Sequence, residues 1–348
     1  MGSQLGRLWT RRACLLAVLA LATPALAAPS PLHRIVAVGD LHGDFSAWRD
    51  IVRAAQLVDG KGGWIGGDAV LVQTGDVVDR GPDSLKIVQD LMRLQREAAR
   101  SKGQVVALVG NHEAMNVSGD FRYVSPADYA AYIDDRSELR RENVYESNKK
   151  LIENFYHQRD PAMNGDAIKE AWLQATPLGS IEHRVAWTPN GSIGRWIVGN
   201  PAIAILDGNI FLHGGISPAY VHMPIDEINR QVRAALLAHS TDPQSIINNP
   251  QGPLWYRGLA GSNEKGETAD PPVAVEQQLQ SILSAYGAKR IVIGHTPTLS
   301  GIALSHDGRL ARIDTGISSV YGGKVSYLEI LDGNPIPHVV ERSQATLK

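Results

Sequence analysis

Short apolar runs recur along the chain, and longer stretches with helical spacing of apolar residues lie between them. The runs at 35–38, 70–73 and 105–109 predict strands, and the stretches at 45–55 and 83–100 predict helices. Each run is apolar at nearly every position, which is typical of strands covered by helices on both faces of a sheet. The first third of the chain therefore predicts alternating strands and helices around a well-buried sheet.

The strand pattern resumes after residue 200. Strands are predicted at 202–206, 210–212, 291–293, 310–313 and 325–331, and helices at 226–238 and 274–286. Hairpin turns are predicted between strands by Asp207-Gly208-Asn209, Asp307-Gly308 and Asp332-Gly333. The second half thus combines antiparallel and parallel strands, and the predicted fold class is α/β, a four-layer α/β/β/α sandwich of two mixed sheets.

Residues 118–189 have a different pattern and predict a mostly helical insertion. Helices are expected at 127–155 and 167–174, with Glu146 and Lys150 at i,i+4 spacing. The apolar residues available for an inner face are Leu139, Leu151, Ile152 and Phe155. The mixed charges of 134–160 indicate a solvated helix surface rather than a surface that contacts substrate.

The first 27 residues have the layout of a secretory signal. Arg7, Arg11 and Arg12 precede an apolar run at 13–22, and small residues at 25–27 form a cleavage site. The run is too short to favour a retained membrane anchor, so a domain at 28–348 is expected to be exported to the bacterial periplasm or secreted. Both the general secretory route and the twin-arginine route are compatible with these residues.

Composition excludes several classes of function. The 348 residues carry 34 Lys+Arg against 36 Asp+Glu, a formal net charge of -2, so no basic surface is expected and nucleic acid is not a predicted partner. Cys14 is the only cysteine and lies within the predicted signal. Zinc fingers and thiol catalysis are therefore excluded from the mature protein.

Five of the predicted strands end on residues that can bind a metal. The residues that follow the runs at 35–38, 70–72, 105–109, 210–212 and 291–293 are Asp40, His42, Asp76, Asn111, His112, His213 and His295. Because active sites form where the strands of an α/β sheet end, these residues are expected to converge on one centre.

The ligand types indicate which metals the centre binds. Carboxylate, carboxamide and imidazole groups without thiolate suit Mn²⁺, Fe or Zn²⁺, and Mn²⁺ is the favoured ion. Two divalent ions are predicted rather than one, because the set is too large for a single ion that must also keep a position open for water. Asp76 has two oxygens and is the candidate for bridging them.

The motifs GDLHGD, GDVVDRG, GNHE, LHGG and GHT occur in this order between residues 39 and 296. In this order they resemble the calcineurin-like metallophosphoesterases, specifically the phosphoprotein phosphatase branch, and within it the bacterial and plant Shewanella-like protein phosphatases. PLWYRG at 253–258 and DTG at 314–316 stand where eukaryotic Ser/Thr phosphatases carry other motifs. The resemblance therefore leaves phosphoserine, phosphothreonine and phosphotyrosine open.

The resemblance implies a role for each matching residue. It places Asp40 and His42 on the first metal, Asp76 between the metals, and Asn111, His213 and His295 on the second metal. It makes His112 the general acid and Asp79 the carboxylate that orients it. Phosphate would be bound by Arg80, Asn111 and Arg257, and Asp314 and Tyr321 are further candidates to line the phosphate pocket, although Asp314 is also placed to cap the turn before Gly316.

The implied reaction is hydrolysis of phosphomonoesters by a hydroxide that bridges two metal ions, with no covalent phosphoenzyme. The expected partners are phosphorylated proteins or peptides and small phosphomonoesters. GHTP at 294–297 followed by DTG also resembles diadenosine tetraphosphatases, so a bis(5'-nucleosyl)-tetraphosphatase is the alternative. A non-catalytic phosphate-binding module is a third, less favoured hypothesis, because His112, Asp79 and Asp76 are all present.

Overall fold

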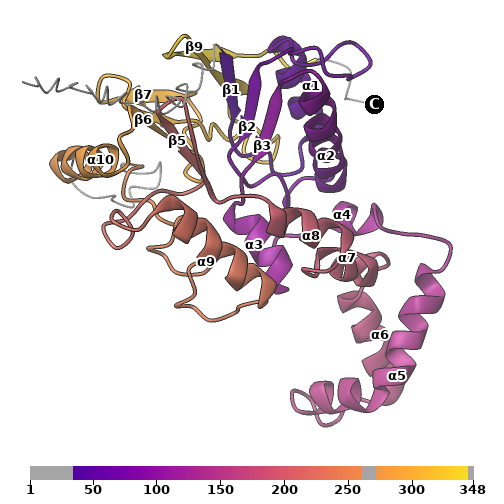
Figure 1. The fold of residues 1–348 in the computed structure, drawn as a ribbon. Coiled ribbons are helices and arrows are strands. Elements are labelled where there is room, and N and C mark those ends of the chain that lie inside the picture. The colour runs from indigo at the N-terminus through magenta and orange to yellow at the C-terminus, as the bar shows by residue number, and fades with distance from the viewer. Residues whose placement is uncertain (1–33, 261–271, 344–348) are drawn as a thin grey trace, which may run out of the picture. The chain divides into compact units, whose positions relative to one another are not determined.

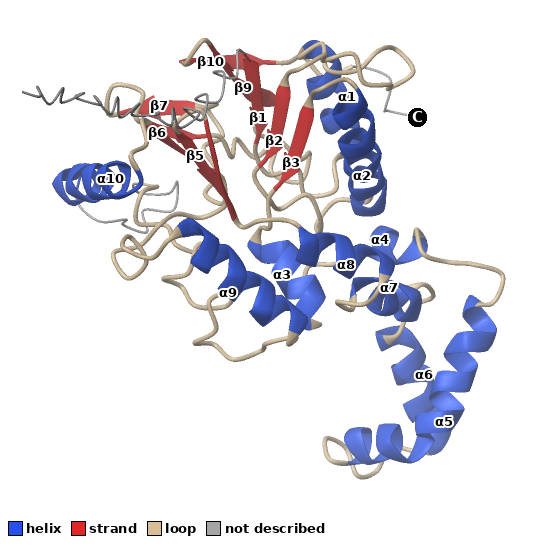
Figure 2. Ribbon diagram, in the orientation of Figure 1, coloured by secondary structure: helices blue, strands red, loops and turns tan. Residues whose placement is uncertain are grey.

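Two five-stranded sheets form the centre of the protein, and helices cover their outer faces (Figures 1 and 2). The computed structural model describes residues 34–260 and 272–343, so the predicted signal at 1–27 and Cys14 lie outside the described residues. The first sheet has the order β10-β9-β1-β2-β3, formed by Asn334–Val339, Ser326–Leu331, Arg34–Val38, Val70–Gln73 and Gln104–Ala107. The second has the order β4-β5-β6-β8-β7, formed by Ile203–Leu206, Asn209–Leu212, Arg290–Ile293, Leu310–Arg312 and Ala303–Ser305.

Alternate residues of each central strand enter two different cores. In β1, Ile35 and Ala37 belong to the cluster between the two sheets, whereas Val36 and Val38 belong to the cluster under the helices. Phe211 of β5 joins the first of these clusters from the second sheet. Because both faces are buried, the strands are apolar throughout, and the predicted sandwich is confirmed.

Helices α1, Phe45–Ala54, and α2, Ser84–Arg100, lie against the first sheet (Figure 1). Helices α9, Ile225–Leu237, and α10, Pro272–Tyr286, contact strands of the second sheet. The Asp44 carboxylate accepts a hydrogen bond of 2.9 Å from the Ala47 N–H, so the last residue of GDLHGD caps α1. Within the described residues no helix is long and apolar enough to span a membrane.

All three predicted hairpin turns are present. They join β4 to β5, β7 to β8 and β9 to β10, which pair antiparallel. Both central residues of each turn have positive φ, the geometry that Asp-Gly sequences favour, at Asp207 and Gly208, Asp307 and Gly308, and Asp332 and Gly333.

The segment between β3 and β4 is helical, but it is divided into more helices than the sequence predicts. It contains α3, Asn111–Ser118; α4, Pro126–Ala130; α5, Ser137–His157; α6, Gly165–Ala175; α7, Ser180–Trp187; and α8, Ser192–Gly199. The predicted continuous helix at 127–155 is wrong, because residues 131–136 interrupt it. There the Asp134 side chain accepts the Arg136 N–H at 2.8 Å, a local bond that competes with the helix.

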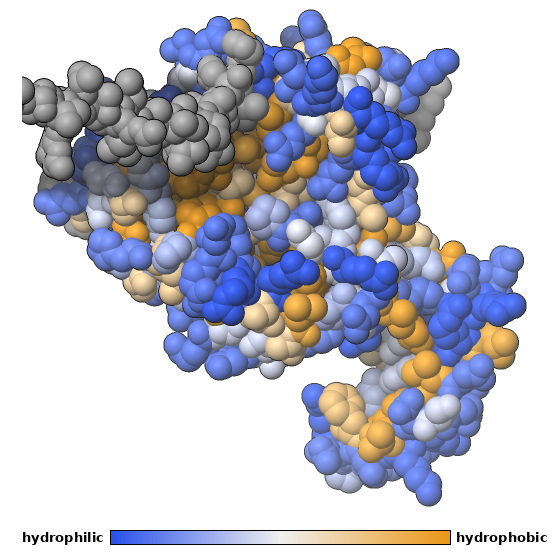
Figure 3. Space-filling model, viewed as in Figure 1, coloured by the Kyte–Doolittle hydropathy of each residue, from blue (hydrophilic) through white to orange (hydrophobic). Residues whose placement is uncertain are grey.

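The predicted inner face of α5 is wrong for three of its four residues, since only Ile152 is partly buried. Leu139, Leu151 and Phe155 are 63%, 70% and 50% exposed, because α5 contacts α6 and α7 along one side only. The buried contact is made instead by Tyr145, whose ring lies 5.2 Å from that of Trp172 on α6. Hydrophobic patches are accordingly visible on the surface of the lobe formed by α5 and α6 (Figure 3). Glu146 lies 3.9 Å from Lys169 of α6.

A buried histidine sits where the helical segment joins the body of the protein. His183 of α7 is 3% exposed, and its Nδ1 has no hydrogen-bond partner within the described residues. The aromatic rings that surround it belong to Phe121, Tyr129, Tyr132 and Trp187. Burial, and secondarily the charge of Arg184, lowers the pKa of His183 to about 3.

We expect this histidine to make the protein less stable in acid. An unfolded histidine has a pKa of about 6.5, so below that pH the unfolded chain binds a proton that the folded chain does not. The free energy of unfolding is therefore at its full value above pH 6.5 and decreases as the pH falls toward 3. At about 1.4 kcal/mol per pH unit, the 1.5 units from 6.5 to 5 cost about 2 kcal/mol of unfolding free energy. Denaturant unfolding of His183→Phe should lack this loss between pH 7 and 5. The exposed His222→Phe should keep the wild-type dependence, and a wild-type dependence in His183→Phe would contradict the expectation.

Candidate metal centre

The structure brings all six predicted metal ligands to the same ends of the strands. β1, β2 and β3 run parallel in one sheet and β5 and β6 run parallel in the other, so their carboxyl ends face one region. The residues that lie just beyond these ends, each at most 5% exposed, are Asp40, His42, Asp76, Asn111, His213 and His295. A helix that the sequence did not predict, α3, begins on Asn111 and fixes that residue and His112 in its first turn.

Asp76 lies at the centre of this group. Its Oδ2 is 3.8 Å from His42 Nε2 and 3.3 Å from His213 Nε2. Asp76 therefore belongs to two sets of possible metal ligands whose donor atoms lie within 4.8 Å of one another. One set is His42, Asp76 and His112, and the other is Asp76, His213 and His295.

The second set presents lone pairs to one another. His213 Nδ1 lies 3.0 Å from the Thr74 carbonyl oxygen, and His295 Nε2 lies 3.2 Å from that of Trp255. Because a carbonyl can only accept, these nitrogens carry the protons, and the other two nitrogens face each other 3.0 Å apart without a proton. Asn111 Oδ1, also an acceptor, is 2.9 Å from His213 Nε2. Converging acceptors fit a divalent cation, so these residues fit the second of the two predicted ions.

His42 is oriented in the same way, and Asp40 lies beside this group. His42 Nδ1 lies 3.1 Å from the Val78 carbonyl oxygen, which directs Nε2 toward Asp76. Asp40 accepts the His295 N–H at 3.1 Å, and burial, followed by the charges of Asp314 and Asp76, raises its pKa. Buried carboxylates that repel each other are stabilised by cations, so these residues also fit an ion.

His112 differs from His42 and His213 because the partner of its Nδ1 is a carboxylate and not a backbone carbonyl. Its Nδ1 lies 2.6 Å from Asp79 Oδ2, and Asn116 Nδ2 donates to the other Asp79 oxygen at 3.0 Å. Burial opposes the charged form, but Asp76 and Asp79 outweigh it and raise the pKa of His112. Burial lowers the pKa of His42 to about 3 and that of His295 well below its ordinary value. The site therefore favours neutral imidazoles at His42 and His295 and a charged one at His112.

Glu113 is a positioning residue that the sequence analysis missed. Its carboxylate accepts hydrogen bonds of 2.8, 2.9 and 2.8 Å from the N–H groups of Asp76, Val77 and Gly110. These bonds join the turn after β2 to the start of α3. A Cβ on Gly110 would lie 2.3 Å from Asp76 Oδ1, so glycine is required for this approach. The signal was present, because Glu113 is the last letter of GNHE.

The two predicted phosphate-binding arginines approach the group from different loops. The Arg257 guanidinium donates from Nη1 to the His295 carbonyl at 2.7 Å and to Thr296 Oγ1 at 2.8 Å. The Arg80 guanidinium carbon lies over the rings of Tyr123 and Tyr321, at 4.6 and 5.3 Å from their centroids.

Asp314 takes one of its two predicted roles, the cap of the turn before Gly316. Its Oδ1 accepts the Gly316 N–H at 3.0 Å, which is the predicted turn cap. It also lies close enough to Asp40 for the two charges to interact, and burial raises the pKa of Asp314 to about 6.

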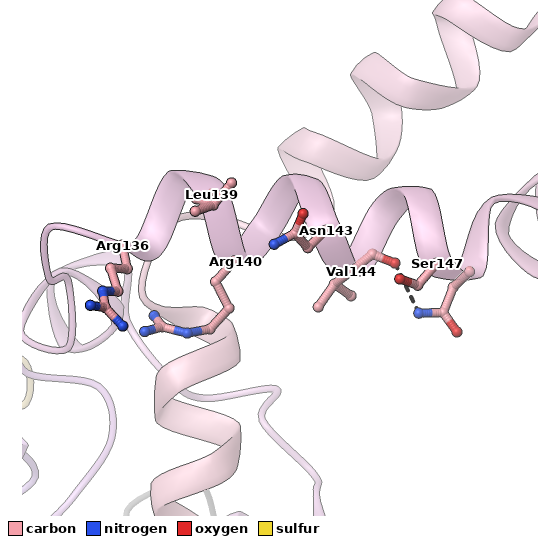
Figure 4. Close-up of a pocket in the computed structure, with 7 residues that line it drawn as sticks. Arg136, Leu139, Arg140, Asn143, Val144 and Ser147 are labelled. Atoms are coloured by element: carbon pink, nitrogen blue, oxygen red, sulfur yellow. Dashed lines mark hydrogen bonds between the residues drawn. The ribbon is translucent and has the colours of Figure 1, made fainter.

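The pocket drawn in Figure 4 is separate from the candidate centre. It lies along α5, where Asn148 Nδ2 donates to the Val144 carbonyl at 2.8 Å. Its lining residues are Arg136, Leu139, Arg140, Asn143, Val144, Ser147 and Asn148, and none of them is a predicted site residue.

Comparison with known proteins identifies a family whose domain includes all the candidate ligands. The family described as calcineurin-like phosphoesterase matches residues 33–299. Shewanella-like protein phosphatase 2 of Arabidopsis thaliana is 32% identical over 292 residues, which cover 82% of this chain and 72% of that protein. Shewanella-like protein phosphatase 1 of Plasmodium berghei (strain Anka) is 28% identical over 312 residues, which cover 86% and 72%.

A solved structure shows the same fold. The cold-active protein-tyrosine phosphatase of a psychrophilic Shewanella species has a TM-score of 0.63 at 22% identity, covering 89% of this chain and 81% of that one. The resemblance read from the motifs is thus confirmed. The chain belongs to the calcineurin-like phosphoesterases, is related to the Shewanella-like protein phosphatases, and is a metal-dependent phosphoesterase hydrolase.

Proposed function

We propose that this protein is a phosphatase with two metal ions that hydrolyses phosphomonoesters on phosphorylated proteins or peptides. The observation that carries the proposal is the position of Asp76, whose carboxylate is shared by two sets of histidines. The names of the relatives support the choice of a phosphoprotein substrate.

The first ion would be held by Asp40, His42 and Asp76, and the second by Asp76, Asn111, His213 and His295. Mn²⁺ is the ion we propose, because the donors are oxygen and imidazole nitrogen without thiolate. When bound, the ions would supply Lewis-acid chemistry, which activates water near neutral pH and neutralises the charge of the phosphoryl group.

The protein's own residues would handle the proton and the phosphoryl oxygens. His112 would hold a proton at Nε2, because Asp79 occupies Nδ1, and would donate it to the leaving oxygen. Arg80 and Arg257 would bind the phosphoryl oxygens through their N–H groups. The Asn111 amide would do the same, since its Nδ2 makes only a weak contact of 4.0 Å with the Met115 sulfur.

Metal removal and a substrate panel test this function. Chelator-stripped protein should lose turnover and recover it when Mn²⁺ is restored, with Fe²⁺ and Zn²⁺ compared under the same conditions. Initial rates should then be measured on peptides carrying phosphoserine, phosphothreonine or phosphotyrosine and on diadenosine tetraphosphate. We expect at least one phosphopeptide to be cleaved faster than the nucleotide. The His112→Asn variant, purified in parallel, controls for contaminating phosphatases.

Two results would reject the proposal in different ways. Faster cleavage of diadenosine tetraphosphate would make the protein a nucleotide hydrolase. Metal-loaded protein without activity on any phosphopeptide or on a small aryl phosphate would indicate a non-catalytic phosphate-binding module.

A further inference from the structure

Two tyrosines from distant parts of the chain contact the Arg80 guanidinium. Tyr123 lies in the loop between α3 and α4, and Tyr321 lies between β8 and β9. The guanidinium carbon is 4.6 Å from the first ring centroid and 5.3 Å from the second. A cation over the face of an aromatic ring at these distances is attracted by the ring quadrupole.

The same tyrosines also contact two histidines of the candidate centre. The Tyr123 ring lies 5.0 Å from that of His112, and the Tyr321 ring lies 5.3 Å from that of His42. The two histidine rings are themselves 4.8 Å apart. Arg80, the two tyrosines and the two histidines therefore form a closed circuit of neighbouring side chains, which fixes Arg80 relative to the candidate acid and a candidate ligand.

The backbone of Arg80 is held by the same loop that provides Tyr123. Arg80 has φ 68°, a left-handed conformation that costs free energy in a residue other than glycine. Its N–H donates to the Tyr123 carbonyl at 2.9 Å, and Ser125 Oγ donates to the Gly81 carbonyl at 3.0 Å. These bonds keep the strained turn in place.

The loop of Tyr321 is anchored from the other side. The Ser319 N–H donates to Asp44 Oδ2 at 2.9 Å, and Ser318 Oγ donates to the His42 carbonyl at 3.3 Å. Both loops are thus attached to the body of the site, and Tyr123 is 38% exposed.

The edge of the Arg80 guanidinium is left for a ligand. Within the described residues Arg80 has no carboxylate partner within salt-bridge distance, and its buried Nε has no hydrogen-bond partner. Aromatic contacts occupy the faces of a guanidinium, whereas its N–H donors lie in its plane. The orientation of the group is therefore set by rings that do not compete with an oxyanion for these donors.

We propose that Tyr123 and Tyr321 are positioning residues that orient Arg80 toward the phosphoryl group of the substrate. This inference rests on the proposed function, in which Arg80 binds phosphate. It assigns a role to the loop that leads into the helical segment, since Tyr123 belongs to that loop.

Binding of inorganic phosphate to the Mn²⁺-loaded protein, measured by calorimetry, tests the inference without requiring turnover. Tyr123→Leu and Tyr321→Leu should each weaken phosphate binding by about 3- to 10-fold, the size of a partly desolvated cation–π contact. Tyr123→Phe and Tyr321→Phe keep the ring and should bind within about twofold of the wild type. Tyr156→Leu, on the remote helix α5, is a matched control and should have no effect.

A double-mutant cycle with Arg80→Ala separates positioning from direct contact. If the tyrosines act through Arg80, Tyr123→Leu should weaken phosphate binding no further in the Arg80→Ala protein. Additive losses, or equal losses for the Phe and Leu variants, would overturn the inference. Unchanged phosphate affinity in Arg80→Ala would instead refute the role that the proposed function gives to Arg80. Thermal melting of each variant identifies any that does not fold, and the Phe variants then decide the matter.

Discussion

Replacing His112 by asparagine will lower kcat by about 10²- to 10⁴-fold, the range expected for loss of a general acid. The reason is the Asp79 contact of 2.6 Å at Nδ1, which leaves Nε2 as the proton donor and raises the pKa of the imidazole. Metal content should change little, because asparagine removes no proposed ligand. Steady-state kinetics on an alkyl phosphate and metal analysis of the same protein samples give the two numbers.

Two controls accompany this variant: a comparison of substrates with different leaving groups, and the dependence of activity on pH. An aryl phosphate with an acidic leaving group needs less protonation and should lose less activity than the alkyl phosphate. The charged form of His112 is present below its raised pKa, so activity should fall as the pH rises through it. Asp79→Asn should move this fall to lower pH. His112 Nε2 is also 3.8 Å from Asp76 Oδ2, so parallel losses of metal and kcat would mean that His112 is a ligand instead.

Replacing Asp76 by asparagine should remove both metal ions together. Its carboxylate belongs to both sets of candidate ligands, so its loss acts on both sites at once. Changes to residues that only support ligands cost about 10- to 100-fold in metal affinity, so loss of a shared ligand should cost more than about 100-fold. Titration with Mn²⁺ should show both sites weakened and turnover abolished.

Asp68→Asn provides a matched control for this variant. Asp68 is an exposed carboxylate in the loop before β2, and its replacement should leave both sites intact. Loss of one ion with full retention of the other in Asp76→Asn would show that Asp76 does not bridge. The proposed arrangement of the two ions would then need another shared ligand.

Much of the fold followed from local patterns that report burial directly. Strands such as 70–73 are buried on both faces, so their residues are apolar without exception until Gln73, and their boundaries agree with the structure. Strand β10 was missed because it contains Pro335 and Pro337, and proline argues against a strand. A strand at the edge of a sheet tolerates proline, since some of its N–H groups have no neighbour to bond.

Helices outside the body were harder to predict. The apolar residues of α5 were assigned to an inner face by spacing, yet spacing cannot say whether another element lies opposite. Leu151 is 70% exposed because the neighbouring helices cover only one side of α5. Helix α3 was missed for a different reason: its apolar residues are few, and its start is set by the turn at Gly110.

The candidate centre was predictable for residues whose place is set by the strand that precedes them. Each ligand directly follows a strand, and parallel strands bring such ends together, so Asp40 and His295 could be expected to meet although 255 positions separate them. Tyr123 could not be found in this way. Its part in the site depends on how a loop folds back over Arg80, and no motif or spacing records that contact.

Five of the twelve non-glycine residues with left-handed backbone in the described part of the chain lie at this centre, namely His42, Asp76, Asp79, Arg80 and His295. At about 1–2 kcal/mol each, these conformations together approach the whole net stability of a typical domain, about 5–15 kcal/mol. In a lineage that does not need the chemistry, mutations would replace these left-handed conformations by unstrained ones, because each replacement increases the free energy of unfolding. A chain that still carries all five is therefore expected to be under continuing selection for what this centre does.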